Sequence, residues 1–270
     1  MEHLDSYQLP ATSYQLPGRK VVSGSLKLKA GSWRLSACIT ERMPPVLIAL
    51  LLLLTLGGCN SSSSPNTPTT PPPAGPVPVV VVLGDSLTAG PGLRSEDAYP
   101  AVLQQRARDA GYPHRFMNAG VSGDTTADGL RRLDTALHAD TKVLVVALGA
   151  NDGLQRMPVE TVKQNLRQII ERARSRNIRV LLCGMESLPT NGIDYVIRFH
   201  NIFPDLATEY QLPLMPFLLE GVFGRQDLNL PDGLHPNAAG MRVIASTMWP
   251  YLEPLLQATR LTLTLITPNS

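Results

Sequence analysis

Short apolar runs recur along this chain, and segments with helical periodicity separate them. The first run, Val79 to Leu83, reads VVVVL and lies between Pro78 and Gly84. A continuous β-branched run bounded by turn residues is typical of a strand that is buried on both faces. Similar runs are found at 115–118, 142–148 and 178–183, with a weaker one at 214–217.

Helical patterns fill the intervals between these runs, at 101–110, 126–138, 158–176, 195–210 and 236–252. Strands that alternate with helices predict an α/β domain with a parallel central sheet and helices on both faces. We expect this domain to span 79–254 and to be followed by a C-terminal tail, 255–270. Within the tail, Leu261 to Ile266 alternates apolar residues with Thr, as an edge strand does.

The first 58 residues read as an N-terminal extension that ends in a signal peptide. Val46 to Leu56 is apolar except for Thr55, and Gly57-Gly58-Cys59 follows at once. A membrane-spanning helix needs about 20 apolar residues, whereas the core of a secretory signal needs about 7 to 15. The length therefore favours a signal peptide. A start near Met43, or slightly upstream so that Arg42 is included, fits such a signal better than Met1 does.

Leu56 to Cys59 (LGGC) resembles the bacterial lipobox, whose cysteine becomes the lipidated first residue of the mature protein. A plain signal peptide and an uncleaved anchor are the alternatives. Residues 59–78 are rich in Ser, Thr and Pro, and 60–78 contain seven prolines, so the segment cannot bury a core and reads as a tether. We expect a lipoprotein of the bacterial cell envelope that faces the periplasm, or a secreted protein.

Charge and cysteine content exclude several classes of function. Residues 1–58 hold six Lys or Arg and three Asp or Glu, which leaves 18 and 19 for the remaining chain. A near-neutral domain lacks the basic stripe that nucleic-acid binding requires. The three cysteines fit neither a disulfide scaffold nor a zinc site. Cys183, in an apolar run, is expected to be a buried structural thiol and not a reactive one.

Polar motifs follow the predicted strands, where a parallel α/β sheet builds its sites. Gly84-Asp85-Ser86-Leu87 follows the first strand and Asn118-Ala119-Gly120 the second. Gly149-Ala150-Asn151-Asp152 follows the third, and the block Asp232 to Pro236 (DGLHP) precedes the last helix. Each motif alone also fits an ordinary turn, loop cap or solvated histidine. Their joint occurrence, in order, indicates a catalytic site.

A serine hydroxyl needs a neighbouring base, and that base needs a third group to fix its tautomer. His235, with Asp232 three residues earlier, can act in this way on Ser86. The charge that develops on the attacked carbonyl needs preorganised donors. The backbone amides of Ser86 and Gly120 and the side-chain amide of Asn151 are the predicted donors.

These four motifs resemble the sequence blocks of the SGNH (GDSL-type) hydrolases, and together they bracket nearly the whole domain. The resemblance implies a three-layer α/β/α flavodoxin-like fold. It also implies Ser86, Gly120, Asn151 and His235 as the name-giving residues, Asp232 as the third triad member, and neither metal nor cofactor.

Further similarity points to the periplasmic acyl-thioesterase, lysophospholipase and arylesterase branch. It is carried by Asn151 to Leu154, by Leu188 to Gly192 and by Pro216 to Val222. The branch typically has Gly-Gly-Asn-Asp where this chain has Gly149-Ala150-Asn151-Asp152, and it often has a Tyr near Asn191. The implied substrates are small acyl esters, thioesters or lysolipids. A carbohydrate deacetylase of the same family and a non-catalytic envelope lipoprotein are the alternatives.

Overall fold

The computed structural model describes residues 77–266, with side chains described as far as Thr259. The predicted signal segment, the proposed lipidation site Cys59 and the tether up to residue 76 lie outside the described residues. No helix between 77 and 266 combines the length and apolarity needed to cross a bilayer.

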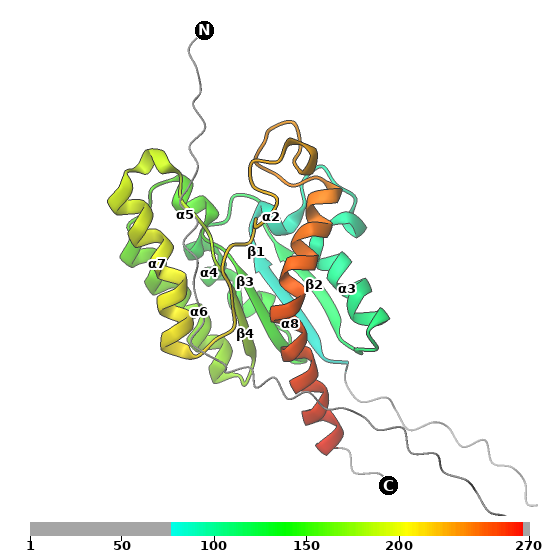
Figure 1. Ribbon diagram of the computed structural model, residues 1–270. Coiled ribbons are helices and arrows are strands. Elements are labelled where there is room, and N and C mark those ends of the chain that lie inside the picture. The colour runs from blue at the N-terminus through cyan, green and yellow to red at the C-terminus, as the bar shows by residue number, and fades with distance from the viewer. Residues whose placement is uncertain (1–76, 267–270) are drawn as a thin grey trace, which may run out of the picture. The chain divides into compact units, whose positions relative to one another are not determined.

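A five-stranded sheet forms the centre of the domain (Figure 1). Its strands are β1 (Val79–Gly84), β2 (Arg115–Gly120), β3 (Thr141–Ala147), β4 (Arg179–Cys183) and β5 (Leu214–Met215). They lie in the order β2-β1-β3-β4-β5, and all neighbouring pairs are parallel. The predicted strands and the predicted parallel sheet are confirmed.

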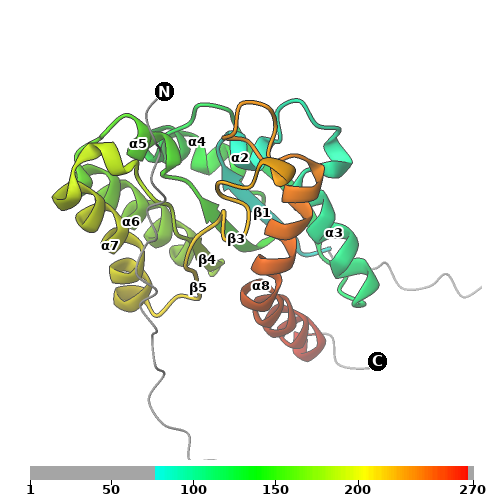
Figure 2. The same ribbon diagram turned by 45° about the horizontal axis from the view of Figure 1, so that its top comes forward.

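Helices cover both faces of the sheet, which gives the predicted three-layer α/β/α architecture (Figures 1 and 2). On one face α3 packs on α8, and on the other α6 packs between α4 and α7. The helices are α2 (Ser86–Ala89), α3 (Tyr99–Asp109), α4 (Thr126–Ala136), α5 (Ala150–Leu154), α6 (Val159–Ser175), α7 (Ile193–Tyr210) and α8 (Ala238–Ile266). Three short 3₁₀ turns lie at Ser95–Asp97, Pro189–Asn191 and Gln226–Leu228.

Burial explains why strand β1 consists of branched apolar residues. Every side chain from Val79 to Leu83 is at most 1% exposed, because β1 is central and has helices on both sides. Each such residue contributes about 1.5–3 kcal/mol of burial free energy. Cys183, at the end of β4, is also fully buried, and burial raises the pKa of its thiol. The prediction of a structural thiol is thereby confirmed.

The C-terminal segment differs from the sequence prediction. Helix α8 continues through Pro254 to Ile266, so the expected edge strand at 261–266 is wrong and the boundary set at residue 254 falls inside a helix. Beyond that boundary, Leu256 is fully buried and Thr259 Oγ lies 2.6 Å from His114 Nε2. These contacts tie the end of α8 to the chain just before β2. Alternation of Leu and Thr could not reveal this packing.

The sheet order places the site. From β1 the chain moves to β2 on one side, and then crosses back to β3 on the other side of β1. Loops after β1 and β3 therefore diverge, and crevices in open α/β sheets form at such switch points. Ser86 follows β1 and Asn151 follows β3, so both lie at this position.

Candidate active site

The structure brings Ser86, His235 and Asp232 together into a hydrogen-bonded chain. Ser86 Oγ lies 2.9 Å from His235 Nε2, although the two residues are 149 positions apart. His235 Nδ1 lies 2.7 Å from Asp232 Oδ2. With Nδ1 protonated and donating to the carboxylate, Nε2 is free to accept the Ser86 proton.

Asp232 is held by its own turn. Its Oδ1 accepts hydrogen bonds from the backbone amides of Leu234 (2.9 Å) and His235 (3.0 Å). The His235 backbone and side-chain bonds, with the Leu234 bond, lower the pKa of Asp232 to about 2. The carboxylate is therefore ionised near neutral pH, and one turn supplies both the base and the group that orients it.

The nucleophile begins a short helix directly after β1. Asp85 caps α2, accepting a hydrogen bond from the Leu87 amide at 2.9 Å. Its side chain is fully buried, and burial raises its pKa to about 7, partly offset by the backbone bonds. At Gly84, a Cβ atom would lie 2.0 Å from Thr88 Oγ, so only glycine allows α2 to fold back this tightly. The turn leaves Ser86 half-buried.

Gly120 does not have a free amide for the predicted role. Its N–H donates to Asn118 Oδ1 at 2.9 Å. The residue ends β2, where a Cβ atom would lie 2.3 Å from the amide nitrogen of Ala89 in α2. Gly120 is therefore required for close packing of β2 on the nucleophile helix, and its amide is already engaged.

Gly123, three residues further, is the glycine that sequence reasoning missed. It is exposed at φ +88°, and nothing lies within 4 Å of the position that a Cβ would occupy. In the described part of the chain, its amide has no hydrogen-bond acceptor, and neither has the amide of Ser86. The loop is fixed beside the nucleophile turn because the Val121 amide donates to the Gly84 carbonyl at 3.0 Å. The sequence signal was the Ser122-Gly123-Asp124 turn after β2.

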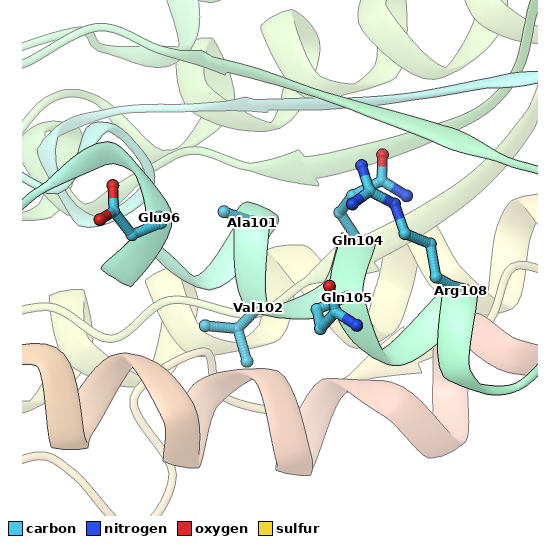
Figure 3. Close-up of a pocket in the computed structure, with 6 residues that line it drawn as sticks. All are labelled: Glu96, Ala101, Val102, Gln104, Gln105 and Arg108. Atoms are coloured by element: carbon cyan, nitrogen blue, oxygen red, sulfur yellow. The ribbon is translucent and has the colours of Figure 1, made fainter.

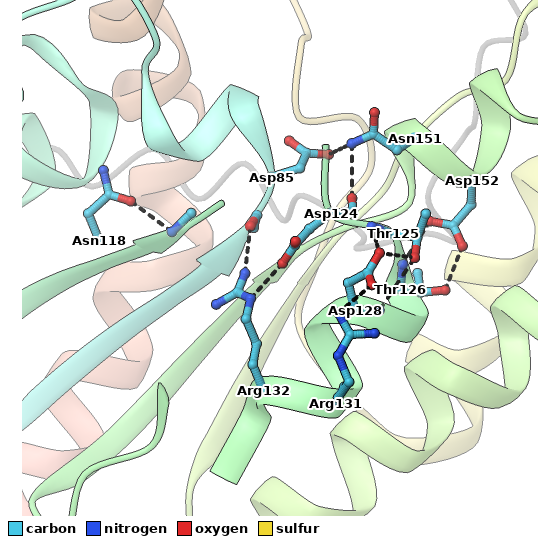
Figure 4. Close-up of polar contacts among 12 residues, drawn as sticks. Asp85, Asn118, Asp124, Thr125, Thr126, Asp128, Arg131, Arg132, Asn151 and Asp152 are labelled. Atoms are coloured by element: carbon cyan, nitrogen blue, oxygen red, sulfur yellow. Dashed lines mark hydrogen bonds and ion pairs between the residues drawn. The ribbon is translucent and has the colours of Figure 1, made fainter. Parts of the chain in front are cut away.

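Asn151 lies in α5 and reaches across to both loops (Figure 4). Its Nδ2 donates to the Asp124 carbonyl at 2.9 Å, and Asp85 Oδ2 lies 3.4 Å away. The first bond fixes the amide plane. The second is long, so an oxyanion can displace Asp85 as the acceptor of that hydrogen.

Asp152 anchors α5 to the first residue of α4. Its carboxylate accepts hydrogen bonds from Thr126 N (2.8 Å) and Thr126 Oγ (2.6 Å) at the start of α4. Burial raises the pKa of Asp152, and the bonds from Thr126 oppose that rise. Asp152 is itself fully buried, so it orients its neighbour Asn151 and does not face a substrate.

No group of three or more His, Cys, Asp or Glu side chains in the described range is arranged to hold a metal ion. A hollow of about 440 Å³ lies on α3 and the preceding turn (Figure 3). It is lined by Glu96, Ala101, Val102, Gln104, Gln105 and Arg108. The lining includes no member of the triad and no nucleophile, so the candidate site is the triad at the sheet edge.

Known proteins share this architecture and sequence. Residues 82–243 match the GDSL-like lipase/acylhydrolase family. The esterase TesA of Pseudomonas aeruginosa is 40% identical over 178 residues, which cover 66% of this chain and 89% of that protein. Thioesterase 1/protease 1/lysophospholipase L1 of Escherichia coli is 36% identical over 179 residues, covering 66% and 84%. A crystal structure of TesA gives a TM-score of 0.63 at 38% identity, covering 66% of this chain and 99% of that one.

Proposed function

Because this chain belongs to the GDSL-like lipase/acylhydrolase family and is a serine esterase, we propose that it hydrolyses carboxylic esters and thioesters with apolar acyl chains. The main support is the hydrogen-bonded triad of Ser86, His235 and Asp232, with contacts of 2.9 Å between Ser86 and His235 and 2.7 Å between His235 and Asp232. The relatives named arylesterase, from Vibrio mimicus, and thioesterase 1/protease 1/lysophospholipase L1 support aryl, thiol and lysolipid leaving groups.

The reaction proceeds in two halves. Ser86 Oγ attacks the acyl carbon while its proton passes to His235 Nε2, and the carbonyl oxygen takes up negative charge. Collapse of this intermediate expels the alcohol or thiol, which receives the proton from His235, and leaves the acyl group on Ser86. Water then repeats the sequence, with His235 as base, and releases the carboxylic acid.

The negative charge requires donors that are in place before the reaction. We assign this role to the amides of Ser86 and Gly123 and to Asn151 Nδ2. The two backbone amides are unpartnered within the described residues, whereas that of Gly120 donates to Asn118. Asn151 is oriented by its bond to the Asp124 carbonyl.

Asn151→Ala is expected to lower kcat about 100- to 1,000-fold with a much smaller change in KM, as found for loss of one oxyanion donor. The amide meets the substrate oxygen most strongly when that oxygen is charged, so the transition state loses more than the ground-state complex. Measuring kcat, KM and melting temperature on one preparation tests this. Asn201→Ala is the control, since Asn201 is an exposed residue of α7. A destabilised Asn151 variant with near-normal kcat removes Asn151 from the mechanism.

The surface around the triad supports an apolar acyl chain. In the described part of the chain, seven of the eight exposed large apolar side chains follow the carboxyl ends of strands or adjoin His235. They are Val121, Leu154, Leu188, Ile193, Ile197, Phe223 and Leu234; the eighth is Val77, before β1. Exposed apolar side chains in the segments that follow the carboxyl ends of the strands, where parallel α/β sheets bind their ligands, support binding of an apolar acyl group.

A series of aryl esters and acyl thioesters from acetyl to dodecanoyl tests the substrate class. We expect kcat/KM to rise beyond acetyl, and Leu154→Ser to lower it for the longer chains only. Val77→Ser, at the opposite edge, is the matched control. Activity confined to acetyl groups would favour a carbohydrate deacetylase, and no turnover of any member would favour a non-catalytic lipoprotein.

We further propose that the enzyme is a lipoprotein of the bacterial envelope, anchored to the membrane through Cys59. Support comes from the apolar run that ends in Gly57-Gly58-Cys59 and from the proline-rich segment between Cys59 and β1. Such a tether lets a lipid-anchored domain stand off the membrane.

Cys59→Ser is expected to abolish incorporation of labelled fatty acid, and globomycin is expected to accumulate the precursor of the wild-type protein. The lipid is attached at Cys59, so Ser61→Ala, two residues further along the tether, serves as the control and should keep its label. The kcat of the Cys59 variant should match wild type because the tether separates anchor from site. Undiminished labelling of Cys59→Ser would refute the anchor.

A further inference from the structure

One arginine joins the loops that carry the oxyanion donors (Figure 4). Arg132 lies in α4, and its Nη2 donates to the Gly84 carbonyl at 2.9 Å, two residues before the nucleophile. Its Nε lies 2.5 Å from Asp124 Oδ2, in the loop that follows β2. Only 23% of the Arg132 side chain and 11% of the Asp124 side chain are exposed. Solvent therefore screens this pair far less than a surface pair.

Asp124 links Arg132 to Asn151, the third oxyanion donor. Its backbone carbonyl accepts the 2.9 Å hydrogen bond from Asn151 Nδ2, and its own position is next to Gly123. A shift of Asp124 therefore moves the Gly123 amide and the Asn151 side chain together. A shift of Gly84 moves the Ser86 turn.

We propose that Arg132 is a positioning residue that holds the nucleophile turn, the Gly123 loop and Asn151 in the geometry needed for the oxyanion. This inference rests on the proposed function. The guanidinium suits the task because its planar fork donates in two fixed directions at once, to a carbonyl and to a carboxylate. A lysine ammonium at the same place is a single point charge on a flexible stem, and it cannot keep both contacts in one plane.

The neighbouring arginine provides a matched control. Arg131 lies on the same helix but is 74% exposed, and its ion pair is with Asp128 in the same helix, at 2.7 Å. It contacts neither the nucleophile turn nor the Gly123 loop in the described structure. Removal of Arg131 therefore changes the charge of α4 by the same amount without touching the donors.

The test compares Arg132→Met, Arg132→Lys and Arg131→Met on a soluble aryl ester. We expect Arg132→Met to lower kcat about 10- to 100-fold, with KM changed less than about threefold, since misplacement of about 1 Å costs a factor of this size. Arg132→Lys should restore part of the loss, and Arg131→Met should stay within about twofold of wild type. An Arg132→Met enzyme with wild-type kcat, or with a loss confined to KM, overturns the proposal.

A second variant covers the case in which Arg132→Met leaves Asp124 buried without a partner and does not fold. The double variant Asp124→Asn/Arg132→Met removes both charges and keeps the Asp124 carbonyl. Its melting temperature should approach that of wild type, while its kcat should stay low. A folded double variant with normal kcat contradicts the positioning role.

Coupling to Asn151 separates positioning from a general loss of structure. If Arg132 acts through the donors, Arg132→Met should lower kcat less when Asn151 is already absent. We expect the fold-loss in kcat to be at least three times smaller in the Asn151→Ala background than in the wild-type background. Equal factors in both backgrounds overturn the proposal. A wild-type enzyme that hydrolyses no ester would instead refute the proposed function, so the two failures are distinguishable.

Discussion

Ser86→Ala is expected to lower kcat by a factor of about 10⁴ to 10⁶, because triad members act as one unit and no other group replaces the nucleophile. The fold should persist. Ser86 is half-buried in a turn fixed by Gly84 and Asp85, and among residues 77–266 the lost hydroxyl is hydrogen-bonded to His235 alone. Steady-state kinetics and a melting curve on the same preparation measure both quantities.

Ser187→Ala is the matched control for this experiment. The Ser187 hydroxyl follows β4 and is buried, and no hydrogen-bond partner is present for it among the described residues. Its removal should leave kcat within a few-fold of wild type. A Ser86→Ala enzyme that retains more than a tenth of the wild-type rate contradicts the mechanism.

Asp232→Asn is expected to lower kcat about 10⁴-fold, the cost of presenting the wrong histidine tautomer to the nucleophile. An asparagine oxygen can still accept the Leu234 and His235 amides that Asp232 now binds. The asparagine nitrogen, which replaces the carboxylate oxygen that accepts from His235, donates to Nδ1. The imidazole proton then lies on Nε2, where it faces Ser86. The positions of the triad side chains are kept, but His235 Nε2 can no longer accept the proton of Ser86.

The pH dependence sharpens this prediction. Hydrogen bonds from His235 and Leu234 lower the pKa of Asp232 to about 2, so the wild-type carboxylate does not titrate between pH 5 and 9. The ratio of wild-type to Asp232→Asn kcat should therefore stay large across that range. Asp227→Asn, an exposed carboxylate paired with Arg225, controls for charge. A deficit that disappears at one end of the range would mean that Asp232 acts otherwise.

The fold was predictable because its signals are local. Strand β1 had to be branched and apolar since both of its faces are buried, and α6 shows its buried residues at helical spacing. Leu261 to Ile266 misled because alternating Leu and Thr residues also fit a helix that continues from a packed segment. What decides the outcome there is tertiary packing at Leu256 and Thr259.

The triad was predictable for a related reason, because its members follow strands or lie three residues apart. The choice between Gly120 and Gly123 was not. It depends on which amide is already bound, and the bond from Gly120 to Asn118 Oδ1 is a feature of loop geometry. The Arg132 contact with Gly84 spans 48 positions and leaves no periodic signal in the sequence.

Reaction with a fluorophosphonate, followed by peptide mass spectrometry, tests the central claim most directly. The probe forms a covalent bond only with a serine that is activated by a base and faces an oxyanion site. We predict one adduct per chain on the peptide that contains Ser86, and none in Ser86→Ala. An adduct on another residue, or an enzyme that hydrolyses esters without forming any adduct, would contradict the assignment of Ser86 as the nucleophile.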